Sequence, residues 1–494
     1  MDAAEEERKT GEEDKQIAVV SLENRAEVEI TDIVEASEGA YTKAEFDRLL
    51  WKIDLILWIC GGVQQADKTS ISTQATFGLR TDTHLVGQQY SWLSTVFYLT
   101  YLVCEFPGNI ILQRFNVGRA LGCFMFAWGI IVLCVAFAKN FADLMVLRAL
   151  QGAAECTISP GLLIITGSWY TKREHPVSFG AIAALINYGV GTHAKNHPGG
   201  LAAWKGISLF LGSLTIVLSV VVFFVLGTPR EVPWLNERER KMAIARTVAN
   251  QTGSDRAKHE KFKWNQFRNA FKDPQTYFFF FITVTCQMPN GGVTTFGNLV
   301  YTSFGFSALD TLVKGTIPQS LVSVAHFIVV GLVCLRWPKT RFICTLLSII
   351  PAFVGMLCLG LIKTTPRIFK WGLFLMTVTG NILLASNVAG RTKKSVTATI
   401  LFVAYCTGNA IGAQLFQAKD APRYIPALIA CACLFGVEFV GLVLWRYYYI
   451  FKNAQRDRRA AALGLTETDI EHLGRLAAEA DTDDYENEHF RYSI

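Results

Sequence analysis

The sequence has none of the motifs by which soluble enzymes are commonly recognised. It contains no P-loop, no G-x-S-x-G turn and no H-E-x-x-H helix. Its 12 cysteines lie mostly inside apolar segments, without the paired spacing of a zinc site or a disulfide framework. We therefore expect no enzyme activity, no coupling to ATP hydrolysis within this chain, no metal site and no cofactor.

Charge is also scarce. Only 18% of the 494 residues are charged, whereas 51% are hydrophobic. This balance favours burial in a lipid bilayer over burial in several aqueous cores. The net charge of +6 does not indicate nucleic-acid binding, because Lys and Arg lie between long apolar segments, as they do at the ends of membrane spans.

A cleavable signal peptide is not evident, since residues 1–48 are polar and acidic. Scanning for the roughly 20 apolar residues that a membrane-spanning helix needs predicts an all-α membrane protein with about 12 spans. The predicted spans are 49–65, 91–112, 120–138, 141–165, 177–190, 206–226, 276–299, 312–335, 342–362, 371–389, 396–416 and 425–450.

These spans divide the chain into two six-helix bundles, at 49–227 and 276–450, with a polar N-tail (1–48), a central loop (228–275) and a C-tail (451–494). The central loop and the start of the C-tail are rich in Lys and Arg, so the positive-inside rule places them, and both termini, in the cytosol. Residues 236–250 are expected to form a surface helix. The tail after Ala460 is expected to be mobile, with a short amphipathic helix at 466–478.

A weak repeat supports two related halves. The turn after the second span runs from Arg114 to Arg119, and the turn after the eighth runs from Arg336 to Arg341. Each has an aromatic residue directly after its first arginine. Transporters built from parallel repeats show this kind of internal similarity.

Charged residues inside membrane spans are costly and commonly functional. Arg148 and Glu155 lie seven residues apart in the fourth span, hence on one face of a helix. They are candidates for binding an anion and a proton, respectively. The alternative is a structural pair whose charges neutralise each other, or partners on neighbouring helices.

Asp67 and Lys68 close the first predicted span. They are candidates for a second proton-binding carboxylate and a second anion-binding cation. On position alone, an interfacial pair at a helix end is an equal alternative.

Polar residues in two later spans are candidate substrate ligands. In the seventh span, Pro289 and a Gly-Gly pair are expected to interrupt the helix and expose Asn290 to a cavity. Asn409 and Gln414 lie on the eleventh span. Hydrogen bonding between helices is an equal alternative for these amides.

Glu105 lies near the end of the second span, close in sequence to Arg114 and Arg119. We expect these three residues to form a gate latch.

Short motifs in a fixed order resemble the fungal allantoate permease group of the anion:cation symporters, in the major facilitator superfamily. The resemblance covers 52–458. Its motifs are the segments at 67–70, 87–93, 105–107, 158–161, 249–253, 289–292, 386–390, 392–394 and 421–424.

The resemblance implies a major facilitator fold and proton-coupled uptake of a small organic anion such as a ureido acid, a vitamin or a carboxylate. By this analogy, Asp67 and Glu155 take protons, while Lys68 and Arg148 hold the substrate carboxylate. A monomer in the plasma membrane is expected by the same analogy.

The fifth span departs from the family pattern. Its 14 residues make about 21 Å of helix, against a hydrocarbon core of about 30 Å. The first and tenth spans also look short. The short spans leave open a divergent carrier without activity or an incorrectly spliced gene product. The acidic N-tail and the long C-tail leave open a nutrient-sensing receptor with a transporter fold.

Overall fold

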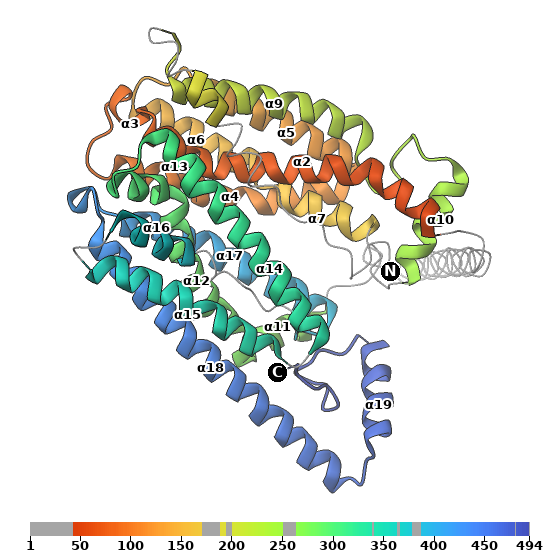
Figure 1. Ribbon diagram of the computed structural model, residues 1–494. Coiled ribbons are helices and arrows are strands. Elements are labelled where there is room, and N and C mark those ends of the chain that lie inside the picture. The colour runs from red at the N-terminus through yellow and green to blue at the C-terminus, as the bar shows by residue number, and fades with distance from the viewer. Residues whose placement is uncertain are drawn as a thin grey trace, which may run out of the picture.

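The computed structural model describes residues 43–169, 188–193, 200–249, 263–337, 340–362, 366–377, 387–479 and 481–493. In these ranges the regular structure is helical, without a β-strand (Figure 1). Seven of the described helices are long and apolar enough to cross a membrane. The predicted fold class of an all-α membrane protein is confirmed.

The first half of the structure contains helices α2 to α7 and α9. Their bounds are α2 Lys43–Thr76, α3 Leu79–Asp82, α4 Gln89–Arg114, α5 Val117–Val135, α6 Phe141–Glu155, α7 Ile158–Trp169 and α9 Ala203–Val225. Within this half α5 packs along α9, and α4 packs along α6. Trp128, Ile207, Leu211 and Val222 belong to its buried core.

Two helices connect the halves. The predicted surface helix at 236–250 is confirmed as α10 (Glu237–Ala249), and α11 (Trp264–Lys272) follows it. Residues 250–262 of the central loop lie outside the described ranges.

The second half contains α12 Pro274–Ser303, α13 Ala308–Thr311, a π-helical turn Leu312–Thr316, α14 Ile317–Arg336, α15 Arg341–Leu361, α16 Arg367–Leu375, α17 Arg391–Leu415, a 3₁₀ turn Ala418–Asp420 and α18 Ile425–Ala462. A last helix, α19 Glu467–Glu479, follows α18.

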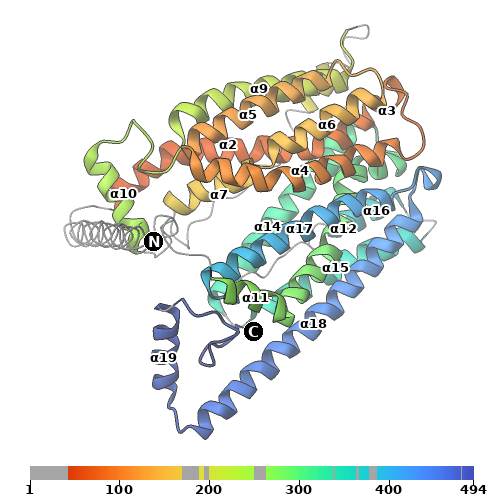
Figure 2. The ribbon, with the colours of Figure 1, turned by 180° about the vertical axis from the view of Figure 1, so that it is seen from behind.

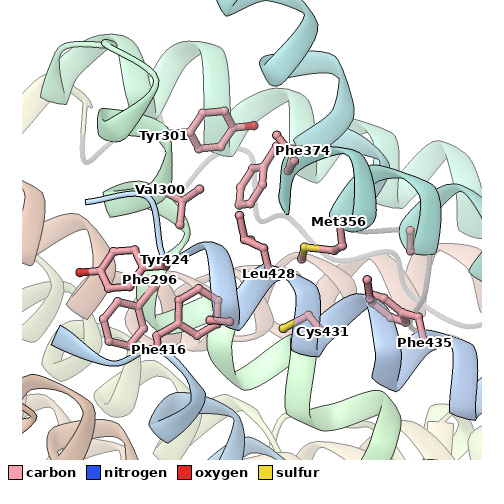
Figure 3. Packing of buried hydrophobic residues seen from close by; sticks show 14 of the residues in the cluster. Phe296, Val300, Tyr301, Met356, Phe374, Phe416, Tyr424, Leu428, Cys431 and Phe435 are labelled. Carbon is pink, nitrogen blue, oxygen red and sulfur yellow. The ribbon is translucent and has the colours of Figure 1, made fainter. Parts of the chain in front are cut away.

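Aromatic side chains dominate the core of the second half (Figure 3). Phe296 of α12 stacks on Phe416, with ring centroids 5.0 Å apart, and Tyr424 packs on both rings. Tyr301 and Phe374 meet edge to face at 4.7 Å. These contacts join α12 to the ends of α16, α17 and α18.

The two halves lie close together at one end of the molecule and diverge toward the other (Figures 1 and 2). The first end carries α3 and α13 and is called the α3 end. The other carries α10, α11 and α19 and is called the α19 end. Across the interface, α2 contacts α12, and α4 contacts α17.

Hydrogen bonds between the halves lie near the α3 end. The Tyr90 hydroxyl donates to the Thr295 carbonyl oxygen at 2.7 Å. Asn298 donates through its backbone N–H to Ser72 at 3.1 Å and through its side chain to Thr73 at 3.0 Å. These bonds close the interface at this end.

The structure corrects the prediction for the first span. It was expected to end at residue 65, but α2 continues to Thr76. Its 34 residues make about 51 Å of helix, which is ample for a bilayer. Asp67 and Lys68 therefore lie inside the helix and not at its end. A polar stretch inside a bundle can stay helical because its side chains find partners on neighbouring helices.

The fourth predicted span is two helices, α6 and α7, separated by a turn at Cys156 and Thr157. Pro160 lacks a backbone N–H and its ring clashes with the carbonyl of the residue four positions earlier, which accounts for the break at this place.

The seventh predicted span is one unbroken helix, contrary to the expectation from its Pro and Gly-Gly. Glycines instead allow α12 and α17 to pack closely against each other. A Cβ on Gly291 would lie 2.4 Å from the Asn409 carbonyl oxygen, and one on Gly412 would lie 2.0 Å from the Met288 carbonyl oxygen. Helices α12 and α17 therefore touch along their backbones.

The fifth predicted span, 177–190, lies outside the described residues except for its last three positions. The tenth, 371–389, is described only at its two ends, 371–377 and 387–389. The other predicted spans correspond to α4, α5, α9, α12, α14, α15, α17 and α18, with shifted ends.

Candidate functional site

Four charged side chains from α2 and α6 meet inside the first half of the structure. Asp67 and Lys68 come from α2, and Arg148 and Glu155 come from α6. Asp67 is 2% exposed, Arg148 5% and Glu155 0%. The structure thus brings together the two charged pairs singled out in the sequence, which we call the four-charge cluster.

Asp67 is held by donors from two helices. Its Oδ2 accepts hydrogen bonds from Trp128 Nε1 at 3.1 Å and from Gln151 Nε2. The Arg148 guanidinium interacts electrostatically with the Asp67 carboxylate. The carboxylate therefore has a cationic partner and two neutral donors.

Lys68 has a different acid as its partner. Its Nζ lies 3.6 Å from Glu155 Oε1 and 5.7 Å from the centre of the Tyr101 ring. Gln64 Nε2 donates to the same Glu155 oxygen at 3.1 Å. The other Glu155 oxygen, Oε2, is buried without a hydrogen-bond partner among the described residues.

Helical geometry accounts for this pairing. Arg148, Gln151 and Glu155 are spaced three and four residues apart, so they form one row along α6. Consecutive residues on a helix point about 100° apart. Asp67 therefore reaches the Arg148 end of that row, and Lys68 reaches the Glu155 end.

A small cavity lies beside the cluster, with a volume of about 20 Å³. Asp67, Lys68, Arg148 and Gln151 line it from the first half, and Thr294 and Thr295 line it from the second. A buried water needs about 10–15 Å³, so this space suits a water and is too small for an organic anion. The cavity as it stands therefore has no room for an organic anion.

The second half adds an amide cluster near the interface. Asn290 donates to Asn409 Oδ1 at 3.0 Å and to Gln287 Oε1 at 3.1 Å. Asn409 donates to the same Gln287 oxygen at 3.1 Å. These contacts match the hydrogen-bonding alternative for Asn290 and Asn409 in this state of the protein.

Gln414 bridges the two halves, because its Nε2 donates to the Thr95 hydroxyl at 2.8 Å. It belongs to the contacts that close the interface near the α3 end, and its role as a substrate ligand stays a prediction.

The structure does not bring the three proposed gating residues together. Asn109 donates to Glu105 Oε1 at 3.5 Å, and the described residues show no ion pair between Glu105 and either Arg114 or Arg119. The two arginines are exposed. The gate latch stays a prediction for another conformation.

Sequence reasoning missed several neutral residues of the site. Gln151 was detectable, since it lies between Arg148 and Glu155 on the same helical face. Trp128 and Thr295 come from helices whose packing against α2 no local pattern indicates. Within the described ranges, no group of three or more His, Cys, Asp or Glu side chains is placed to hold a metal ion.

Comparison with known proteins agrees with this architecture. Residues 57–413 match the Major Facilitator Superfamily. The chain is 30% identical to the allantoate permease of Saccharomyces cerevisiae over 495 aligned positions, which cover 93% of this chain and 89% of the permease. It is 33% identical to an uncharacterized transporter of Schizosaccharomyces pombe, covering 86% of this chain and 83% of that protein.

Solved structures show the same fold at low sequence identity. The inward-open xylose transporter XylE from E. coli gives a TM-score of 0.60 at 14% identity, covering 79% of this chain and 95% of XylE. The nucleoside transporter NupG gives 0.55 at 12% identity, covering 79% of this chain and 98% of NupG. On the family match and the extent of these similarities, the chain belongs to the Major Facilitator Superfamily, within the group that includes the allantoate permease.

Proposed function

We propose that this transporter carries a small organic anion together with protons, by alternating access, and that the four-charge cluster is the shared site. The observation that carries the proposal is the meeting of buried Arg148 and partly buried Lys68 with two buried carboxylates beside the interface between the halves. The name of the allantoate permease supports a ureido acid as one substrate class.

Charge balance explains how protons and anion would be coupled. The cluster holds two cations and two carboxylates, so its formal charge is zero. An added anion would leave one uncompensated negative charge in a buried site, which is costly. A proton on Asp67 or Glu155 would cancel that charge and free Arg148 or Lys68 to hold the substrate.

Glu155 is suited to the proton-binding role. It is fully buried, and one of its oxygens has no hydrogen-bond partner among the described residues. Asp67 has more donors, from Trp128 and Gln151, which favour its charged form. We assign the transported proton first to Glu155 and a second proton-binding role to Asp67.

Transport would require the halves to separate at the α3 end. The closed cavity has no room for the substrate, and hydrogen bonds such as Tyr90 to Thr295 would have to break. We propose that bundles 49–227 and 276–450 rock about the cluster. We propose that the α19 end faces the cytosol, that both termini are cytosolic and that the transporter lies in the plasma membrane.

The test is uptake of labelled anions by transport-deficient yeast that express the chain, at external pH 5 and pH 7. The panel contains allantoate, nicotinate and short dicarboxylates, with surface abundance measured in parallel. Uptake of one compound that is faster at pH 5 would support the proposal. Uptake that is independent of the proton gradient, including after collapse by a protonophore, would contradict proton coupling.

A further inference from the structure

The last residues of the chain are bound to the second half, contrary to the expectation of a mobile tail. After α18 the chain turns back through α19, and its end lies beside α11 (Figures 1 and 2). We call residues 481–493 the strap. Its contacts are made to α11, α17, α18 and the segment that precedes α17.

The centre of these contacts is a buried lysine. Lys393, in the first turn of α17, has a side chain that is 0% exposed. Its Nζ lies 2.6 Å from Asp273 Oδ2 and 2.9 Å from Asp484 Oδ2. Asp484 belongs to the strap, so an undocked strap would leave Lys393 with one of its two carboxylates. Removing one partner of a buried ion pair is strongly destabilising.

The strap also caps the beginning of α17. Asp484 Oδ1 accepts from the Ala389 N–H at 2.9 Å, and Asp481 Oδ1 accepts from the Arg391 N–H at 2.8 Å. Helix N-termini have unsatisfied N–H groups and attract negative charge. Gly390 lies between them with φ of +84°, and a Cβ at this position would lie 2.7 Å from the Asp483 Cβ, so only glycine fits here.

Helix α18 holds the far end of the strap. The Tyr492 ring stacks on Tyr449, with centroids 4.5 Å apart, and its hydroxyl donates to Asp484 Oδ2 at 3.0 Å. Arg456 donates to the backbone oxygens of Asp484 and Phe490. Helix α11 adds a bond from Asn269 Nδ2 to Asp483 Oδ2 at 2.9 Å.

We propose that residues 481–493 act as a strap that fastens the N-terminal end of α17 to α11 and α18, and so limits the movement of α17 during transport. Helix α17 is the element of the second half that contacts α4 of the first half. A device that holds one end of α17 therefore acts on the interface that must open. Docking of the strap on α11, α17 and α18 does not depend on which substrate the protein transports.

The experiment is hydrogen–deuterium exchange of the purified full-length protein in lipid nanodiscs, read at residues 481–493 and 389–394. Asp484→Asn removes the charge that faces Lys393 while keeping the side chain's size. We expect exchange in both segments to rise at least tenfold. Glu488→Gln is the matched control, because it removes an exposed ion pair with Arg459 from the same segment, and we expect less than a threefold change.

A second variant covers the case in which Asp484→Asn does not fold. Tyr492→Phe keeps the ring on Tyr449 and removes only the hydroxyl that donates to Asp484. It should raise exchange in the strap about tenfold.

Deletion of residues 481–494 tests the effect on α17 itself. Exchange should rise in α11 and at 391–397, while α5 and α9 in the first half stay unchanged. Unchanged exchange at 391–397 after the deletion, or equal exchange for Asp484→Asn and the parent, would overturn the proposal.

Discussion

The Lys68 Nζ lies 3.6 Å from Glu155 Oε1, although the residue next to Lys68 pairs with a different partner on the same helix. Asp67 instead faces Gln151 and Arg148, one and two turns earlier along the row on α6, and it also accepts a hydrogen bond from Trp128 on α5. One dipeptide on α2 thus meets two opposite charges on α6. We propose that this crossed arrangement lets each cation exchange its carboxylate for that of a substrate.

Glu155→Gln should impair acid-driven accumulation more than exchange. A glutamine cannot gain or lose a proton, but it keeps the side chain's size and a neutral partner for Lys68. We expect accumulation driven by an inward proton gradient to fall at least tenfold, while counterflow exchange at equal pH falls less than threefold.

The control for that variant is Glu467→Gln, an exposed acid at the start of α19, which should change neither activity. Equal loss of accumulation and counterflow in Glu155→Gln would argue that Glu155 shapes the site without carrying a proton.

Gly412→Ala should separate α12 from α17. The added methyl would lie 2.0 Å from the Met288 carbonyl oxygen, which is backbone and cannot move aside cheaply. Overpacking of this kind costs about 1–3 kcal/mol, so we expect a melting temperature lower by several degrees and slower transport. The measurement is thermal unfolding in detergent followed by size-exclusion chromatography.

Gly331→Ala is the matched control, because its Cβ would meet nothing within 4 Å. A Gly412→Ala protein as stable as Gly331→Ala would show that the two helices do not depend on their close contact.

Docking of the strap should weaken at acid pH. Burial would raise the pKa of Asp481, but hydrogen bonds from Lys263 and the Arg391 N–H lower it below 3.8. The docked state therefore favours the Asp481 carboxylate, and its contribution to docking is lost as the pH falls through the lowered pKa. Hydrogen exchange of residues 481–493 at acid and neutral pH, corrected for intrinsic rates, measures the effect. Asp481→Asn should remove this part of the pH dependence, and an unchanged pH dependence in that variant would contradict the assignment.

The fold class and the four charged residues were predictable from the sequence because each depends on a local pattern. Apolar length indicated the spans, and the spacing of Arg148 and Glu155 indicated a shared helical face. The position of Asp67 inside α2 was not predictable, since its helical surroundings depend on Trp128 and Gln151 from other helices. The strap was missed for the same reason. Its polar sequence indicates exposure, whereas Lys393 and Arg456 supply partners from distant parts of the chain.

The most direct test of the central claim is uptake by Arg148→Ala. Arg148 is the buried cation beside the cavity and is proposed to hold the substrate carboxylate. The comparison is Lys139→Ala, which removes an exposed cation after α5. Both variants are measured with the anion identified for the parent protein at pH 5, with surface abundance determined in the same cells. We predict that Arg148→Ala reduces uptake at least a hundredfold at normal abundance while Lys139→Ala transports like the parent. Parental uptake by Arg148→Ala would contradict the assignment of the four-charge cluster as the anion site.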